Sequence, residues 1–209
     1  MKNVIRIGVL SQPELPKQFE PMIEAIFRAQ FRKLCSIVGP KNIALVSSVE
    51  CKVHELASIS AVEEGLILEI EPFETPKEMD DEEAEIKAKI HAILERQPGT
   101  TELDKRISET ALTEFCDIML LVFDKSDPDQ SSRLEEIRKL IFVNEATGAE
   151  LEKLIIDVNC PKRWNADADG DVYFEYVTRA SGQLGVSSAV EIPNQLIDQW
   201  NDTISTVPH

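Results

Sequence analysis

The sequence predicts an α/β fold, a three-layer α/β/α arrangement with a mainly parallel sheet and helices on both faces. Short apolar runs of strand length alternate with longer segments whose apolar residues recur at helical spacing. The clearest alternation spans residues 43–73, where strand, helix and strand follow one another within about thirty residues. A βαβ unit of this kind places its two strands parallel.

The elements of this unit can be justified one by one. Residues 43–46 form a continuous apolar run, and residues 53–64 follow helical spacing with one apolar face. Gly65 then ends the helix, because a residue without Cβ adopts positive φ readily. Residues 66–70 are the second apolar run, and Pro72 ends it.

Patterns of the same kinds predict where the other helices and strands lie. A helix begins at Phe19 and ends before Gly39 and Pro40, which break it. Thr75 and Glu78 have the spacing of a capping box at the start of another helix. The expected strands are 4–10, 43–48, 66–71, 117–124, 153–159 and 172–177. The further expected helices are 78–96, 102–115, 131–144 and 193–204, with a Gly/Ser-rich loop at 181–188. We expect a single domain over 1–209, of which 160–209 is a less regular C-terminal extension.

Composition narrows the class of protein. The four cysteines are scattered without a Cys-x-x-Cys pair, which favours reduced thiols and a cytoplasmic location. No apolar run approaches the roughly 20 residues of a membrane span, and no secretory signal opens the chain. With a net charge of −16, the chain does not show the excess of basic residues that is typical of a nucleic-acid binder. We therefore expect no membrane and no nucleic-acid partner.

The negative charge is concentrated in one segment. Residues 69–85 carry nine acids against Lys77, so half of the net charge lies there. A solvated loop and first helical turn explain this acidity. The alternative is a protein partner that binds the acidic segment 69–85.

Residues 165–171 resemble the start of a calcium loop, with acids at alternate positions and a glycine at the sixth. The twelfth position requires a bidentate glutamate, but Tyr176 stands there and Glu175 comes one residue early. The following residues indicate a strand and not a second helix. We interpret this stretch as a polar turn and expect no metal site and no cofactor.

The order and spacing of several short motifs resemble the SLOG superfamily of Rossmann-like nucleotide-binding domains, which includes LOG and DprA-like members. The chain keeps Ser47-Ser48, Leu56-Ala57, Gly65 and Pro72-Phe73 without a gap, and Phe123-Asp124 stands where the family has Trp-Asp. The resemblance covers about residues 4–125, more weakly to 160. It implies a Rossmann-like fold with a ligand cleft, in a divergent member.

The departures from the family pattern concern its phosphate-binding loops. Ser11 replaces the glycine after the first strand, and Gln12-Pro13 replace the basic pair. Lys52 replaces the glycine of the second turn, and His54 replaces the acid after it. These glycines let backbone N–H groups approach phosphate. The catalytic Pro-Gly-Gly-x-Gly-Thr-x-x-Glu motif of LOG enzymes is absent.

Polar residues at the strand tips form the predicted ligand site. They are Ser11, Gln12, Ser47, Ser48, Lys52, His54 and Asp124. Lys52 would attract an anion, or instead plug the cleft. Cys51, Lys52 and His54 also suggest a Cys/His nucleophile, but adjacent positions on one turn rarely point together. We therefore assign no catalytic residue.

The sequence therefore favours a non-catalytic module that binds or senses a nucleotide or nucleotide derivative. The first alternative is a protein–protein interaction module on a decayed Rossmann-like scaffold, acting through 69–85. A nucleoside-phosphate hydrolase comes third.

Overall fold

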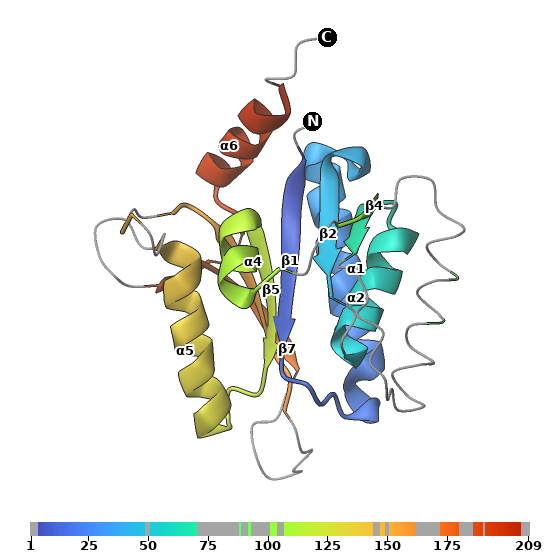
Figure 1. Ribbon diagram of the computed structural model, residues 1–209, viewed down its shortest axis with the longest axis vertical. Helices are drawn as coiled ribbons and strands as arrows, with labels where there is room; N and C mark the ends of the chain where they lie inside the picture. Colours follow the sequence, from blue (N-terminus) through green and yellow to red (C-terminus); the bar gives the residue numbers. More distant parts are fainter. Residues whose placement is uncertain are drawn as a thin grey trace.

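In the computed structural model, the described residues are 4–48, 51–70, 88, 92, 101–103, 107–143, 147–148, 151–161, 172–179, 186–189 and 191–205. Within them, eight strands form one sheet in the order β4-β3-β2-β1-β5-β6-β7-β8. Helices pack against this sheet (Figure 1). The predicted α/β class is confirmed.

The sheet is mainly parallel, as predicted. Its strands are β1 (Ile5–Ser11), β2 (Ile43–Ser47), β3 (Ile67–Ile70), β4 (Thr101–Glu102), β5 (Ile118–Phe123), β6 (Leu154–Asn159), β7 (Tyr173–Arg179) and β8 (Val186–Ala189). All neighbouring pairs from β4 to β6 are parallel. β7 pairs antiparallel with β6 and β8 pairs antiparallel with β7, so the sheet ends in an antiparallel extension.

Five α-helices lie in the described part of the chain. They are α1 (Glu20–Val38), α2 (Lys52–Glu63), α4 (Glu109–Phe115), α5 (Pro128–Phe142) and α6 (Asn194–Ser205). Short 3₁₀ turns, η1 (Lys17–Phe19) and η2 (Pro40–Asn42), flank α1. Gly39 and Gly65 adopt φ of 84° and 80° after α1 and α2, a conformation that glycine tolerates without strain.

Three boundaries differ from the sequence-based expectation. The helix expected from residue 102 begins at Glu109, because Ser108 caps it, while Thr101–Glu102 pairs with β3. α5 begins at Pro128 because the Asp127 carboxylate accepts bonds from the next turn. The expected loop at 181–188 overlaps β8. The acidic segment beyond Ile70 and the calcium-like residues 165–171 lie outside the described residues, as does the helix at 78–96 except for two helical alanines at 88 and 92.

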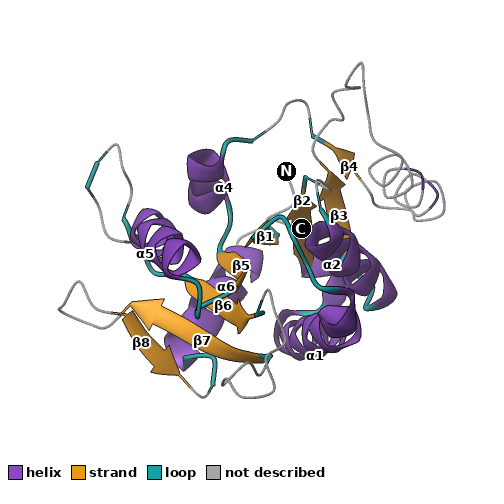
Figure 2. Ribbon diagram, turned by 90° about the horizontal axis from the view of Figure 1, so that it is seen from below, coloured by secondary structure: helices purple, strands orange, loops and turns teal. Residues whose placement is uncertain are grey.

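The helices form one layer on each face of the sheet (Figure 2). α1, α2 and α6 share one apolar core with the odd-numbered residues of β1 and the even-numbered residues of β5. α4 and α5 share a second core with Met119, Leu121 and Phe123 of β5. β5 is thus buried on both faces, as expected for a continuous apolar run in a parallel sheet.

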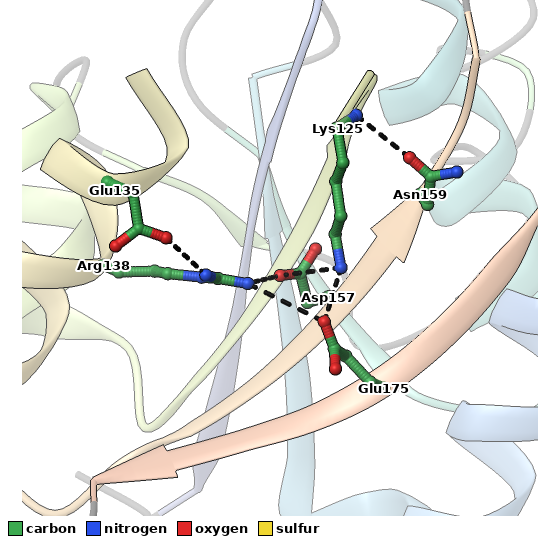
Figure 3. Close-up of polar contacts among 6 residues, drawn as sticks. All are labelled: Lys125, Glu135, Arg138, Asp157, Asn159 and Glu175. Atoms are coloured by element: carbon green, nitrogen blue, oxygen red, sulfur yellow. Dashed lines mark hydrogen bonds and ion pairs between the residues drawn. The ribbon is translucent and has the colours of Figure 1, made fainter. Parts of the chain in front are cut away.

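A buried charge cluster joins α5 to the antiparallel extension (Figure 3). Asp157 of β6 is fully buried and pairs with Arg138 of α5 and with Lys125, whose Nζ lies 3.3 Å from its carboxylate. Lys125 Nζ also lies 2.6 Å from Glu175 of β7. Glu135 completes the cluster through a 2.5 Å contact with Arg138 at the surface.

Because Asp157 neutralises two cations, its removal is expected to destabilise the fold. Asp157→Ala leaves the Arg138 and Lys125 charges partly uncompensated, which should lower the free energy of unfolding by about 3–5 kcal/mol. Glu135→Gln is the matched control, since the Glu135 side chain is 55% exposed and should contribute only ~0.2–1 kcal/mol. Urea unfolding followed by circular dichroism measures both, and equal losses would contradict the assignment.

Candidate functional site

Followed along the chain, the sheet extends first to one side of β1 and then to the other. The chain proceeds from β1 through α1 to β2 on one side, whereas β5 lies on the other side of β1. The helices that follow β1 and β2 cover one face, and α4, which precedes β5, covers the other (Figure 2). In open α/β sheets, ligands bind outside the carboxyl ends of the strands at such a point.

A cavity of about 420 Å³ lies at this place, next to the last residues of β1 and the first turns of α2 and α4. Small-molecule sites commonly have volumes of ~300–1,000 Å³. The described apolar residues that line it are Val9, Leu10, Pro13, Ile107 and Leu112. The described polar residues that line it are Ser11, Ser48, Cys51, His54, Ser108, Glu109 and Arg133.

The α2 helix reaches the cavity with its N-terminal end. Its N-cap residue, Cys51, is extended, and the thiol makes no capping hydrogen bond. The first N–H groups of a helix have no intrahelical acceptor, and they carry the positive end of its dipole. Because both Cys51 and His54 line the cavity, this electropositive end of α2 borders it.

His54 is the buried polar residue of the cavity wall. The residue is only 7% exposed, and its Nδ1 lies 2.8 Å from the Ser48 hydroxyl oxygen. Its Nε2 has no hydrogen-bond partner among the described residues. Burial lowers the pKa of His54 to about 4, so the ring is neutral at pH 7. A neutral ring presents either a donor or an acceptor at Nε2, according to the tautomer.

Ser11 links β1 to the start of α2. Its hydroxyl oxygen lies 3.3 Å from the Cys51 sulfur. Because Ser11 is the last residue of β1, this contact holds the Cys51 thiol close to the strand end.

Few polar contacts hold the N-terminal end of α4, which is the end that borders the cavity. Ser108 accepts a hydrogen bond from the Ala111 N–H at 3.2 Å, and Glu109 pairs with Arg133 of α5 at 2.9 Å. The opposite end of α4 is held more firmly by Lys153. Its buried ammonium donates to the carbonyls of three residues at that end, Thr113, Glu114 and Cys116. Burial lowers the pKa of Lys153.

Three of the seven residues predicted from sequence line this cavity, namely Ser11, Ser48 and His54. The Ser47 hydroxyl instead accepts a bond from Ser58 of α2 at 3.2 Å, inside the packed layer. Lys52 pairs with Glu55 at 2.7 Å and is not among the described lining residues.

Gln12 and Asp124 have structural roles at the strand ends. The Gln12 amide donates to the carbonyls of Glu14 and Cys160 and accepts from the Asp124 N–H. Asp124 itself accepts bonds from the backbone N–H and hydroxyl of Ser126, at 2.9 and 2.5 Å. Neither residue is among those described as lining the cavity.

Sequence reasoning missed the residues that α4 and α5 contribute. Ser108 was placed inside a helix that it in fact caps, and nothing in the sequence brings Arg133 to the end of β1. Cys51 and His54 were expected to point apart, yet both line the cavity, while Lys52 does not. Ser108 stands three residues before Ala111, the first apolar residue of α4, and a serine just before an apolar helical pattern was the signal that could have located this cap.

Comparison of the chain with models of known protein families and with curated proteins gives no match. Among solved structures, the fold is similar to the X-ray structure of DNA processing protein A (DprA) from Streptococcus pneumoniae, with 11% sequence identity and a TM-score of 0.40. The match covers 66% of this chain, which spans about half (48%) of the length of the DprA chain. The likeness to this structure is distant and concerns the fold alone.

This neighbour corrects one expectation. The acidic composition led us to exclude a nucleic-acid partner, but the similar solved structure is that of a DNA processing protein. Net charge describes the whole surface and does not exclude a local site, so the exclusion is withdrawn.

In the described part of the chain, no helix is both long and apolar enough to cross a membrane. The same residues contain no cluster of three or more potential metal ligands from His, Cys, Asp and Glu.

The depressed pKa of His54 predicts a pH dependence of stability. The unfolded state binds this proton near pH 6.5, whereas the folded state binds it only near pH 4, so stability falls as pH decreases through this window. The expected loss is on the order of 3 kcal/mol. Chemical unfolding of the wild type and His54→Gln between pH 7.5 and 4 measures it. The variant should lose less stability over this range, and parallel curves would contradict a neutral buried ring.

Proposed function

We propose that this chain is a non-catalytic module that binds a nucleotide or nucleotide derivative in the cavity at the end of β1. The observation that carries the proposal is the cavity of about 420 Å³ that the uncapped N-terminus of α2 borders through Cys51 and His54. The first N–H groups of a helix have no intrahelical acceptor, and they favour an anionic group. A ligand whose phosphate lies at this end of α2 would satisfy them.

The lining residues support a ligand with two chemically different ends. Ser48 and Cys51 come from the connection between β2 and α2, and His54 from the first turn of α2, where the helix dipole favours an anionic group such as phosphate. Leu10 and Leu112 belong to β1 and α4 and offer an apolar surface to a base. A nucleotide combines these two ends in one molecule.

The surroundings of the Ser48–His54 pair support binding without catalysis. Ser48 and His54 are hydrogen-bonded, but catalytic serine–histidine pairs also need a third group that orients the ring. The second nitrogen of His54 has no such partner among the described residues.

Arg133 lies at the rim of the cavity, where it pairs with Glu109. The side chains of Glu109 and Arg133 are 36% and 57% exposed, so Arg133 is suited to contacting a ligand from solvent.

A thermal-shift panel tests the proposal. It contains nucleosides, their mono-, di- and triphosphates, inorganic phosphate and a short single-stranded DNA. A ligand at 100 times its dissociation constant stabilises the fold by about 2.7 kcal/mol, which raises the melting temperature visibly. If no nucleotide raises it, the proposal fails.

Two variants then locate the bound molecule. Ser48→Ala removes one hydroxyl of the cavity and should weaken the binding of the active nucleotide about five- to tenfold, the effect of one lost hydrogen bond. Lys52→Ala is the matched control, because its ammonium pairs with Glu55 and lies 3.9 Å from Glu20. Calorimetric titration should find its affinity within about twofold of the wild type. If Lys52→Ala weakened nucleotide binding more than Ser48→Ala did, the result would support the attraction of an anion by Lys52 predicted from sequence. It would contradict binding in the cavity at the end of β1.

A further inference from the structure

Two side chains of opposite charge meet at the wall of the cavity. Glu109 of α4 and Arg133 of α5 are 24 residues apart in the sequence, and the fold brings the carboxylate of one to 2.9 Å from the guanidinium of the other. Among the described lining residues, they are the only acidic and basic side chains apart from His54, which is neutral at pH 7. The charge that a ligand meets on this side of the cavity is therefore set by this pair.

The pair is held loosely. Its side chains are 36% and 57% exposed, and water and salt weaken ion pairs in such positions. A guanidinium has five N–H donors, but within the described part of the chain that of Arg133 makes one hydrogen bond, from Nη2 to the Glu109 Oε2 atom. Another anion can therefore replace the carboxylate at little cost.

Phosphate is well suited to that replacement. Two parallel N–H groups of a guanidinium can bond to two oxygens of one phosphate, and such paired, charge-assisted bonds are stronger than a single one. Glu109 has the opposite effect, because its carboxylate occupies Arg133 and repels an anion that approaches it. The two residues are therefore expected to change the affinity for an anionic ligand in opposite directions.

We propose that Arg133 recognises a phosphate group of the ligand and that Glu109 competes with this phosphate for the guanidinium. Binding exchanges one ion pair for another: the contact between Arg133 and Glu109 breaks, and a contact between Arg133 and phosphate forms. The exchange selects phosphorylated ligands over neutral nucleosides. The identity of the ligand as a nucleotide rests on the proposed function, whereas the recognition of phosphate by Arg133 does not require a base.

Calorimetric titration with ATP tests the exchange in three variants. Glu109→Gln releases Arg133 from an exposed ion pair and should tighten ATP binding about two- to fivefold. Arg133→Gln removes a charged hydrogen-bond donor and should weaken ATP binding about tenfold. In the double variant, Glu109→Gln should give no gain over Arg133→Gln alone, because Glu109 acts through Arg133.

Glu135→Gln is the matched control. It makes the same change of charge on α5, at a residue that is 55% exposed, pairs with Arg138 and is not among the described lining residues. Its affinity for ATP should stay within about 1.5-fold of the wild type. The melting temperature of each variant shows that it is folded. A gain from Glu109→Gln that persists without Arg133 would overturn the proposal, because Glu109 would then act by repelling the ligand directly.

Inorganic pyrophosphate separates this inference from the proposed function. If ATP binds and neither Glu109→Gln nor Arg133→Gln changes its affinity, the exchange is overturned and the nucleotide site stands. If pyrophosphate binds, more tightly to Glu109→Gln and more weakly to Arg133→Gln, while ATP does not bind, the exchange is supported and the nucleotide site is contradicted. If neither ATP nor pyrophosphate binds to the wild type or to Glu109→Gln, both are overturned.

Discussion

The carboxyl edge of the sheet depends on one buried amide, that of Gln12. Its backbone N–H continues the pairing of β1 with β5 by donating to Val122, and its side chain bonds to backbone groups of three further residues, Glu14, Asp124 and Cys160. One side chain thereby fixes the ends of β1, β5 and β6 relative to one another. Removing it would leave several backbone groups unsatisfied, and a buried unsatisfied group costs about 1–3 kcal/mol. The cavity lies at an edge that is held in place independently of any ligand.

The molecule treats buried polar groups in two ways. Around Asp157, charges of opposite sign neutralise one another and connect α5 to the antiparallel extension (Figure 3). His54 at the cavity is instead neutral at pH 7, and its Nδ1 lies 2.8 Å from the Ser48 hydroxyl oxygen. Both clusters contain buried atoms without a hydrogen-bond partner among the described residues, His54 Nε2 in one and Asp157 Oδ1 and Arg138 Nε in the other. The two clusters therefore differ in charge and not in how completely they are hydrogen-bonded.

The sequence predicted the fold well because the strands are buried on both faces and therefore appear as uninterrupted apolar runs, most clearly in β5. It predicted the site only in part. Strand tips can be located from sequence, but successive side chains at a tip point in opposite directions, so Ser11 lines the cavity while Gln12 is directed inward. The contributions of Ser108 and Arg133 depend on how α4 and α5 pack, which local patterns do not encode.

The hydrogen bonds from Lys153 to the C-terminal end of α4 have a consequence for how the walls of the cavity are held. A helix of seven residues has little stability of its own, so its position is set by its attachments. Lys153 lies directly before β6 and anchors one end of α4 to the sheet, whereas the end at the cavity is held by an exposed cap and an exposed ion pair. The longer α2, with Val53, Ala57 and Ala61 in the core, is held along its length by apolar packing. The two helices that border the cavity are therefore attached to the sheet differently, α2 by a row of core residues and α4 by buried bonds at the end away from the cavity and exposed polar contacts at the cavity.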